Sequence, residues 1–247
     1  MPLSEENKRP LLWLLAPSFL FGPQTWQGVA QVLRAAGHCA IVADPRPPKL
    51  ADSSFVSPWA EAVVSMVPAD TDASVVVVGH SASCPRLPLV ASMLLDRNIK
   101  VAGIVLVNGR FPADGRAPVE EDEPLAAMLD GLIRPNGYLP PWQRWWGSLV
   151  EDMLPDQQAR NRIFEEAHSV PRILFDEPIP APELPGHVGR GYLTMGEMYR
   201  PSHDRAVAEG WFVGEVEGEH LHMVVRPDEV AEALGQLVAQ FDTEKAD

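Results

Sequence analysis

The stretch Val75-Val76-Val77-Val78-Gly79-His80-Ser81-Ala82-Ser83-Cys84 decides the fold of this chain. Its four valines do not alternate with polar residues, which predicts a strand buried on both faces, as in the middle of a parallel sheet. The strand runs directly into a turn with small residues on both sides of Ser81. A sharp strand-to-helix turn needs such residues, because the backbone folds back on itself there. We therefore expect Ser81 at the carboxyl end of a central strand.

The turn matches the pattern G-x-S-x-G, the nucleophile elbow, with Ser83 in the place of the last glycine. A Gly-Ser turn after a buried strand is the simpler interpretation of this short motif. With the elbow, however, the chain resembles the serine-nucleophile branch of the α/β-hydrolase family, which includes esterases and thioesterases. The resemblance covers nearly the whole chain, from Leu11 to Phe241.

Buried strands and amphipathic helices alternate through the first part of the chain. Besides the valine strand, apolar runs predict strands at residues 11–16, 39–43 and 103–107. Thr25 and Gly37 delimit the first predicted helix, and Ser57-Pro58 begins the second. This alternation favours a mostly parallel sheet with helices on both faces.

The composition changes after Asn108. Residues 109–189 are rich in proline, tryptophan and acidic residues, with helical patterns at 124–132, 142–153 and 155–167 and no clear strand. A disordered linker would not contain so many large aromatic side chains, so we predict an inserted helical cap. The strand pattern returns at 191–195 and 212–216, before a final helix from Pro227. We thus predict a single domain, with its core at 11–108 and 190–241 and a cap at about 109–189.

A second motif, Gly218-Glu219-His220-Leu221-His222-Met223, precedes the final helix. In α/β-hydrolases the histidine base lies on the loop after the last strand, and His220 matches this position better than His222. Both could instead be surface histidines, and a His-x-His pair without a third ligand predicts no metal site. The resemblance implies that His220 takes the Ser81 proton during attack and returns it to the leaving group, while an acidic residue orients the histidine.

Of the three catalytic residues that the resemblance implies (serine, histidine and acid), the acid is the one that the sequence defines least. The family places it in the loop after the strand that follows the cap, where Glu197 is the only acid in the first turn. Asp204 lies further along, inside a predicted helix. Other members take the acid from the loop after the preceding strand, which would be Asp114, because Asn108 is uncharged. The resemblance therefore implies Glu197, with Asp204 and Asp114 as alternatives.

The resemblance also implies an oxyanion hole made by two backbone N–H groups, those of Ala82 and Phe19. Phe19 lies in the loop after the first strand, where Pro17-Ser18 replaces the His-Gly that is frequent in the family. In the cap, three tryptophans either line a site for an apolar or aromatic substrate or only attach the cap to the core: Trp142, Trp145 and Trp146.

These features imply a serine hydrolase that cleaves an ester, thioester or lactone bond of an apolar small molecule, with no metal and no organic cofactor. Ser81 excludes the branches of the family that use an aspartate nucleophile. Two alternatives remain open, because the fold does not determine the reaction. One is a non-hydrolytic enzyme of a biosynthetic pathway, such as a cyclase, a lyase or an enzyme that cleaves a C–C bond. The other is a ligand-binding protein without turnover.

Charge and cysteine content bear on partners and location. The formal net charge of −14 repels phosphate groups, so we expect neither nucleic acid nor an anionic membrane as a partner. Lys8-Arg9 and the apolar run at 11–21 resemble the basic and apolar regions of a signal peptide, but no A-x-A cleavage site follows. We interpret the run as the buried first strand and the loop after it. Cys39 and Cys84 lie in apolar surroundings, which is typical of buried thiols, and we predict a cytoplasmic protein. Homodimer formation is left open.

Overall fold

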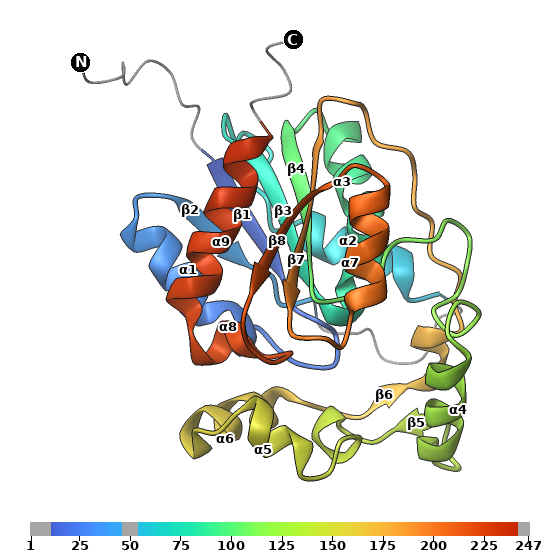
Figure 1. The fold of residues 1–247 in the computed structure, drawn as a ribbon. Coiled ribbons are helices and arrows are strands. Elements are labelled where there is room, and N and C mark those ends of the chain that lie inside the picture. The colour runs from blue at the N-terminus through green and yellow to red at the C-terminus, as the bar shows by residue number, and fades with distance from the viewer. Residues whose placement is uncertain (1–10, 46–53, 242–247) are drawn as a thin grey trace.

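Six strands form the central sheet of a computed structural model that describes residues 11–45 and 54–241 (Figure 1). In chain order they are β1 (Leu11–Ala16), β2 (Cys39–Val42), β3 (Ser74–His80), β4 (Val101–Val107), β7 (Gly189–Met195) and β8 (Phe212–Val216). The spatial order is β2-β1-β3-β4-β7-β8, and every neighbouring pair is parallel. β3 thus lies inside the sheet and its four valines are fully buried, as their lack of alternation predicts.

Helices cover both faces of the sheet. On one face lie α1 (Gln24–Ala35), α8 (His222–Val225) and α9 (Pro227–Gln240), which pack on one another (Figure 1). On the other lie α2 (Val56–Val64), α3 (Leu87–Asp96) and α7 (Arg200–Ala208). Their apolar stripes face the sheet, where Trp26 of α1 and Trp59 of α2 are fully buried. None of the helices in the described ranges is long and apolar enough to cross a membrane.

The segment between β4 and β7 adds no strand to the central sheet and forms a separate layer, green to light orange in Figure 1. It contains α4 (Glu123–Leu132), β5 (Tyr138–Leu139), α5 (Leu149–Met153), α6 (Gln157–Glu166) and β6 (Val170–Pro171). The expectation of a strandless segment was wrong, because β5 and β6 pair antiparallel. Two-residue strands are too short to produce an alternating sequence pattern.

The predicted helix at 142–153 is also interrupted. A 3₁₀ turn occupies Trp142–Arg144, and α5 begins only at Leu149. Gly147 lies between them with a φ of +55°, a left-handed conformation that ends regular helix and that glycine adopts without steric cost. Because of this break, Trp142, Trp145 and Trp146 do not lie on one continuous helix.

Two carboxylates of the β4–β7 segment attach it to the core. Glu177 accepts hydrogen bonds from the backbone N–H groups of Phe55, at 2.7 Å, and Val56, at 3.1 Å, at the N-terminus of α2. Glu166 accepts from the N–H of Gln24, at 2.8 Å, at the N-terminus of α1. Each carboxylate satisfies donors that have no partner within their helix, and it also favours the positive end of the helix dipole.

The two cysteines have different environments. Cys84 is buried, as predicted, but Cys39 is exposed. The expectation failed for Cys39 because it begins β2, which forms an edge of the sheet, so the apolar sequence around it does not cover its side chain.

Candidate active site

Ser81 stands on a strained turn directly after β3. Its φ of +57° is unusual for a residue with a side chain, and such a conformation costs on the order of 1–3 kcal/mol. A 3₁₀ helix, Ser81–Arg86, leads from this turn into α3. The hydroxyl of Ser83, at the position of the missing glycine, lies 2.8 Å from the carbonyl oxygen of His80 and 3.1 Å from that of Ala16. Ser83 therefore links the elbow to the end of β1.

Arg86 also stabilises the elbow. Its guanidinium is buried and donates to the carbonyl oxygens of Ala82, at 2.6 Å, and Leu174, at 3.0 Å, which links the turn to the β4–β7 segment. The guanidinium also lies over the ring of Phe19, 4.8 Å from its centre. Burial lowers the pKa of Arg86 to about 10, so the side chain stays charged at neutral pH.

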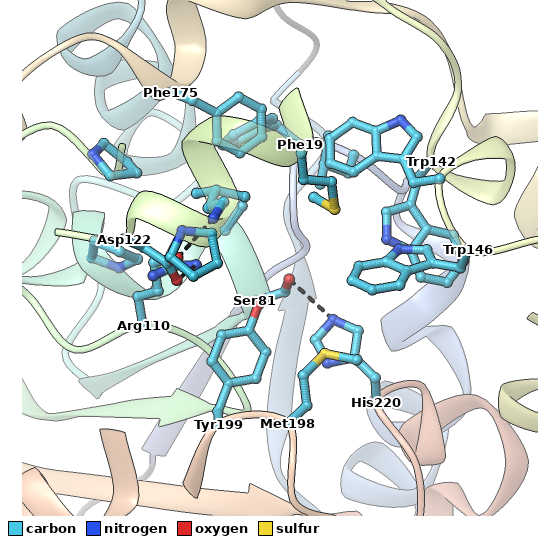
Figure 2. Close-up of a pocket in the computed structure, with 18 of the residues that line it drawn as sticks. Phe19, Ser81, Arg110, Asp122, Trp142, Trp146, Phe175, Met198, Tyr199 and His220 are labelled. Atoms are coloured by element: carbon cyan, nitrogen blue, oxygen red, sulfur yellow. Dashed lines mark hydrogen bonds and ion pairs between the residues drawn. The ribbon is translucent and has the colours of Figure 1, made fainter. Parts of the chain in front are cut away.

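His220 meets Ser81 from the loop between β8 and α8. Its Nε2 lies 3.1 Å from the Ser81 Oγ, and the side chain is buried (Figure 2). Burial lowers the pKa of His220 to about 3, so the ring is neutral at neutral pH. His222 does not share this position, because its Nε2 contacts the Glu229 carboxylate at 2.9 Å. The structure thus brings Ser81 together with His220, and not with His222.

His80 supports the loop that carries His220. The two imidazole rings are 4.5 Å apart, and the Nε2 of His80 lies 2.9 Å from the backbone carbonyl oxygen of His220. Since a carbonyl oxygen only accepts, Nε2 of His80 carries a proton. Phe21 stacks on the ring of His80, and burial, helped by the nearby His220, lowers the pKa of His80 well below its usual value. His80, the first x of the G-x-S-x-G pattern, therefore helps to position the loop of His220, which the motif alone does not indicate.

The predicted acid does not reach the histidine. Glu197 is exposed and pairs with Arg200 at 2.9 Å, and hydrogen bonding to that guanidinium lowers the pKa of the carboxyl. Asp204 is exposed on α7. Asp114 accepts a hydrogen bond from the N–H of Ala181 at 2.8 Å, at the surface. The expectation that one of these carboxylates contacts His220 is thus corrected.

Asn108 occupies the place that was predicted for the acid. Its Nδ2 lies 3.0 Å from Nδ1 of His220. Asn108 directly follows β4, has a φ of +45° and is fully buried. Its backbone N–H donates to the carbonyl oxygen of Leu193 at 2.9 Å, and its Oδ1 accepts from the N–H of Met195 at 3.1 Å. The sequence signal for this position is a polar residue at the carboxyl end of a buried strand. Asn108 was not predicted as the partner of the histidine because its side chain is an amide and not a carboxylate.

A largely apolar pocket of about 240 Å³ opens in front of Ser81 and His220 (Figure 2). Ala82 and Phe19, the residues predicted to supply the oxyanion hole, both line it. All three predicted tryptophans line it too, together with other apolar side chains from the β4–β7 segment: Trp142, Trp145, Trp146, Leu125, Met128 and Phe175. The tryptophans also pack within the structure, since Trp142 contacts Phe21 with ring centres 4.5 Å apart.

Few polar groups face this pocket. Tyr199 lies beside Ser81 in the pocket lining and its ring lies 5.5 Å from that of His220, while burial raises the pKa of its hydroxyl (Figure 2). Arg110 and Asp122 form an ion pair in the wall (Figure 2). Within residues 11–45 and 54–241, no group of three or more His, Cys, Asp or Glu side chains is placed to hold a metal ion.

Comparison with known proteins gives likeness in structure but not in sequence. No family model and no curated protein matches the chain. Among solved structures, an extracellular α/β-hydrolase from a Paenibacillus species superposes with a TM-score of 0.74 at 16% identity, over 92% of this chain and 99% of the other. A pyrethroid hydrolase from Sphingobium faniae gives 0.69 at 18% identity, over 93% and 97%. A point mutant of tomato methylketone synthase I gives 0.72 at 14% identity, over 95% and 100%.

The two buried histidines lead to a prediction about stability and pH. Both have native pKa values below the ordinary 6.5, so below pH 6.5 the unfolded chain binds protons that the native protein does not. The free energy of unfolding should therefore fall as the pH falls from 7 to 5, by up to about 1.4 kcal/mol per pH unit for each histidine. Urea unfolding of a His80→Gln variant should show a weaker loss between these pH values than the wild type does.

The exposed His187 provides the matched control, because His187→Gln removes a histidine that is not buried. The same pH dependence in His80→Gln and in wild type would contradict the assignment of His80 as a buried neutral group.

Proposed function

We propose that this chain, which has the α/β-hydrolase fold, is a serine hydrolase that cleaves an ester, thioester or lactone bond of an apolar small molecule. The proposal rests on the 3.1 Å contact between Ser81 Oγ and His220 Nε2 at an apolar pocket. A serine hydroxyl is a weak nucleophile by itself, and an adjacent imidazole is the usual group that activates it. The names of three structural neighbours, two hydrolases and polyneuridine aldehyde esterase, agree with this class of reaction.

In the proposed reaction, the substrate carbonyl carbon lies next to Ser81 Oγ and its oxygen faces the backbone N–H groups of Ala82 and Phe19. Attack by Oγ forms the new C–O bond and opens the carbonyl π bond onto the oxygen, while the serine proton passes to Nε2 of His220, which has to be unprotonated at this step. The tetrahedral oxyanion is stabilised by the two N–H groups, and His220 then gives the proton to the departing oxygen or sulfur. Water, activated by the same imidazole, releases the acyl group and restores Ser81.

A second candidate function is favoured by Asn108. A neutral amide cannot stabilise an imidazolium as a carboxylate does, so His220 receives less help as a base than in a Ser-His-Asp site. This arrangement is also compatible with a non-hydrolytic reaction in which Ser81 and His220 bind or protonate a substrate oxygen. One of the structural neighbours is named as a synthase, methylketone synthase I.

Labelling with an alkyl fluorophosphonate, followed by a panel of aryl esters, tests the first function. We expect the probe to attach to Ser81 and at least one ester to be hydrolysed with burst kinetics, since an acyl-enzyme forms. A protein that binds the aryl esters but neither reacts with the probe nor releases the aryl alcohol would refute the hydrolase and favour the second candidate or a ligand-binding protein. The cytoplasmic location and homodimer formation stay predictions from the sequence.

The tryptophans of the pocket predict a preference for larger acyl groups. Trp146→Ala removes apolar surface that a long or aromatic acyl chain would cover, and burial of such a side chain is worth roughly 1.5–3 kcal/mol. We therefore expect kcat/KM for hexanoyl or benzoyl esters to fall about tenfold or more, with a smaller loss for acetyl esters. Equal losses at every acyl length would mean that Trp146 only holds the β4–β7 segment in place.

Trp211→Ala is the matched control, because Trp211 is also only partly buried and packs against Phe111 outside this pocket. Its effect on kcat/KM should not depend on acyl length.

A further inference from the structure

A chain of hydrogen bonds runs from β7 to the serine through Asn108 and His220. The N–H of Met195 lies 3.1 Å from Oδ1 of Asn108, and Nδ2 of Asn108 lies 3.0 Å from Nδ1 of His220. Nε2 of His220 in turn lies 3.1 Å from Ser81 Oγ. All four residues are buried, with at most 5% of each exposed, so bulk water competes little for the bonds between them.

The direction of each bond follows from the first donor. A backbone N–H only donates, so the Asn108 atom facing Met195 is the amide oxygen. The NH₂ group of Asn108 therefore faces His220, and because it also only donates, Nδ1 of His220 must accept with a lone pair. Burial keeps the imidazole neutral, so its single proton is on Nε2, the nitrogen that faces Ser81.

The other neighbours of His220 leave this assignment unchanged. His80 donates to the backbone carbonyl oxygen of His220 and does not contact its ring nitrogens. Tyr199 packs its ring against the imidazole, with ring centres 5.5 Å apart. Asn108 thus determines the protonation of the ring.

We propose that Asn108 is a positioning residue that holds His220 in the tautomer with its proton on Nε2. In the resting site His220 then donates to Ser81, and the Ser81 hydroxyl proton is free to donate to an oxygen of a substrate in the pocket. This inference rests on the proposed function where it concerns ester turnover. Ser81 can attack only after the imidazole proton has moved from Nε2 to Nδ1, so Asn108 limits acyl transfer.

An Asn108→Asp variant reverses this restriction. One carboxylate oxygen still accepts from the Met195 N–H, while the other accepts from a proton on Nδ1 and leaves the Nε2 lone pair facing Ser81. In Ser-His-Asp hydrolases the opposite change, aspartate to asparagine, costs about 10⁴-fold through the wrong tautomer. We therefore expect Asn108→Asp to raise the rate of fluorophosphonate labelling, and kcat/KM for aryl esters, by about 10²–10⁴-fold.

Asn98→Asp is the matched control. Asn98 also has a positive φ, +60°, but is exposed, so the same substitution adds the same charge away from the pocket. Its labelling rate should equal that of the wild type.

The tautomer itself is measured by ¹⁵N NMR of the histidine side chains at pH 7, with the His220 signals assigned from their loss in a His220→Gln variant. We expect a protonated Nε2 and an unprotonated Nδ1 in the wild type, and the reverse in Asn108→Asp. The wild-type spectrum decides the assignment even if Asn108→Asp does not fold, and a protonated Nδ1 in the wild type would overturn it.

The two readouts separate this inference from the proposed function. If the tautomer changes as expected but neither protein reacts with the probe or hydrolyses an ester, the tautomer assignment stands and the hydrolase function fails. If both proteins label at the same rate and their His220 tautomers are identical, the inference fails and the hydrolase function stands.

Discussion

Replacing Ser81 with alanine is expected to abolish fluorophosphonate labelling and to lower kcat for any ester that the protein hydrolyses by about 10³-fold or more. The reason is that Oγ forms the covalent bond to the acyl group, and that the residues lining the pocket include no other serine, threonine or cysteine. Alanine removes one oxygen and leaves the elbow backbone unchanged, so the fold should be retained. The measurement is burst and steady-state kinetics with an aryl ester, supported by circular dichroism.

Ser83→Ala is the control for this variant. The Ser83 hydroxyl contacts the carbonyl oxygens of His80 and Ala16 and is not part of the pocket lining. Its loss should cost stability, on the order of 1 kcal/mol, but not turnover. Turnover at the wild-type rate in Ser81→Ala would mean that the reaction does not pass through this serine.

Replacing His220 with alanine should lower kcat/KM for esters by about 10²-fold, the lower end of the usual contribution of a general base, because Asn108 already restricts this role in the wild type. Without the imidazole, the residues that line the pocket include no other side chain placed as a base for Ser81, because their one acid, Asp122, is paired with Arg110. Labelling by the fluorophosphonate should slow by a similar factor. Rates are compared at equal folded fractions, determined by urea unfolding, because the buried ring also packs against His80.

His222→Ala is the matched control, two positions away in the same motif. It removes the contact with Glu229 and should affect stability alone. If His222→Ala were inactive and His220→Ala active, the roles of the two histidines would be exchanged, and the 3.1 Å contact with Ser81 would not be the catalytic one.

The core elements were predictable because their signals are local. Four consecutive valines can be buried on both faces only inside a sheet, and β3 is found there. The boundaries of β1 and β8 agree with their apolar runs, and Pro227 begins α9 as predicted. Small residues around Ser81 indicated the turn that the structure confirms with a φ of +57°.

The β4–β7 segment was predicted less well. The sequence indicated its extent and its aromatic content, but not the β5–β6 pair or the break at Gly147. Both depend on packing against the rest of the molecule, because two-residue strands and single helical turns are not stable by themselves. That the three tryptophans line one pocket was likewise expected only as an alternative to a purely structural role.

The sequence by itself determined the strands of the sheet and the elbow, because each depends on residues adjacent in the chain. The contact of Ser81 with His220, 139 residues away, was predicted only through the resemblance to the α/β-hydrolase family. Only the tertiary structure decided which side chain meets Nδ1 of that histidine. The ends of β4 and β7 lie side by side through parallel pairing, and both are near the loop of His220, so the chain order does not distinguish them. Asn108 takes the position because its left-handed backbone and its bond to the Met195 N–H aim its amide at the ring, whereas Glu197 lies beyond Gly196 and pairs with Arg200 in solvent.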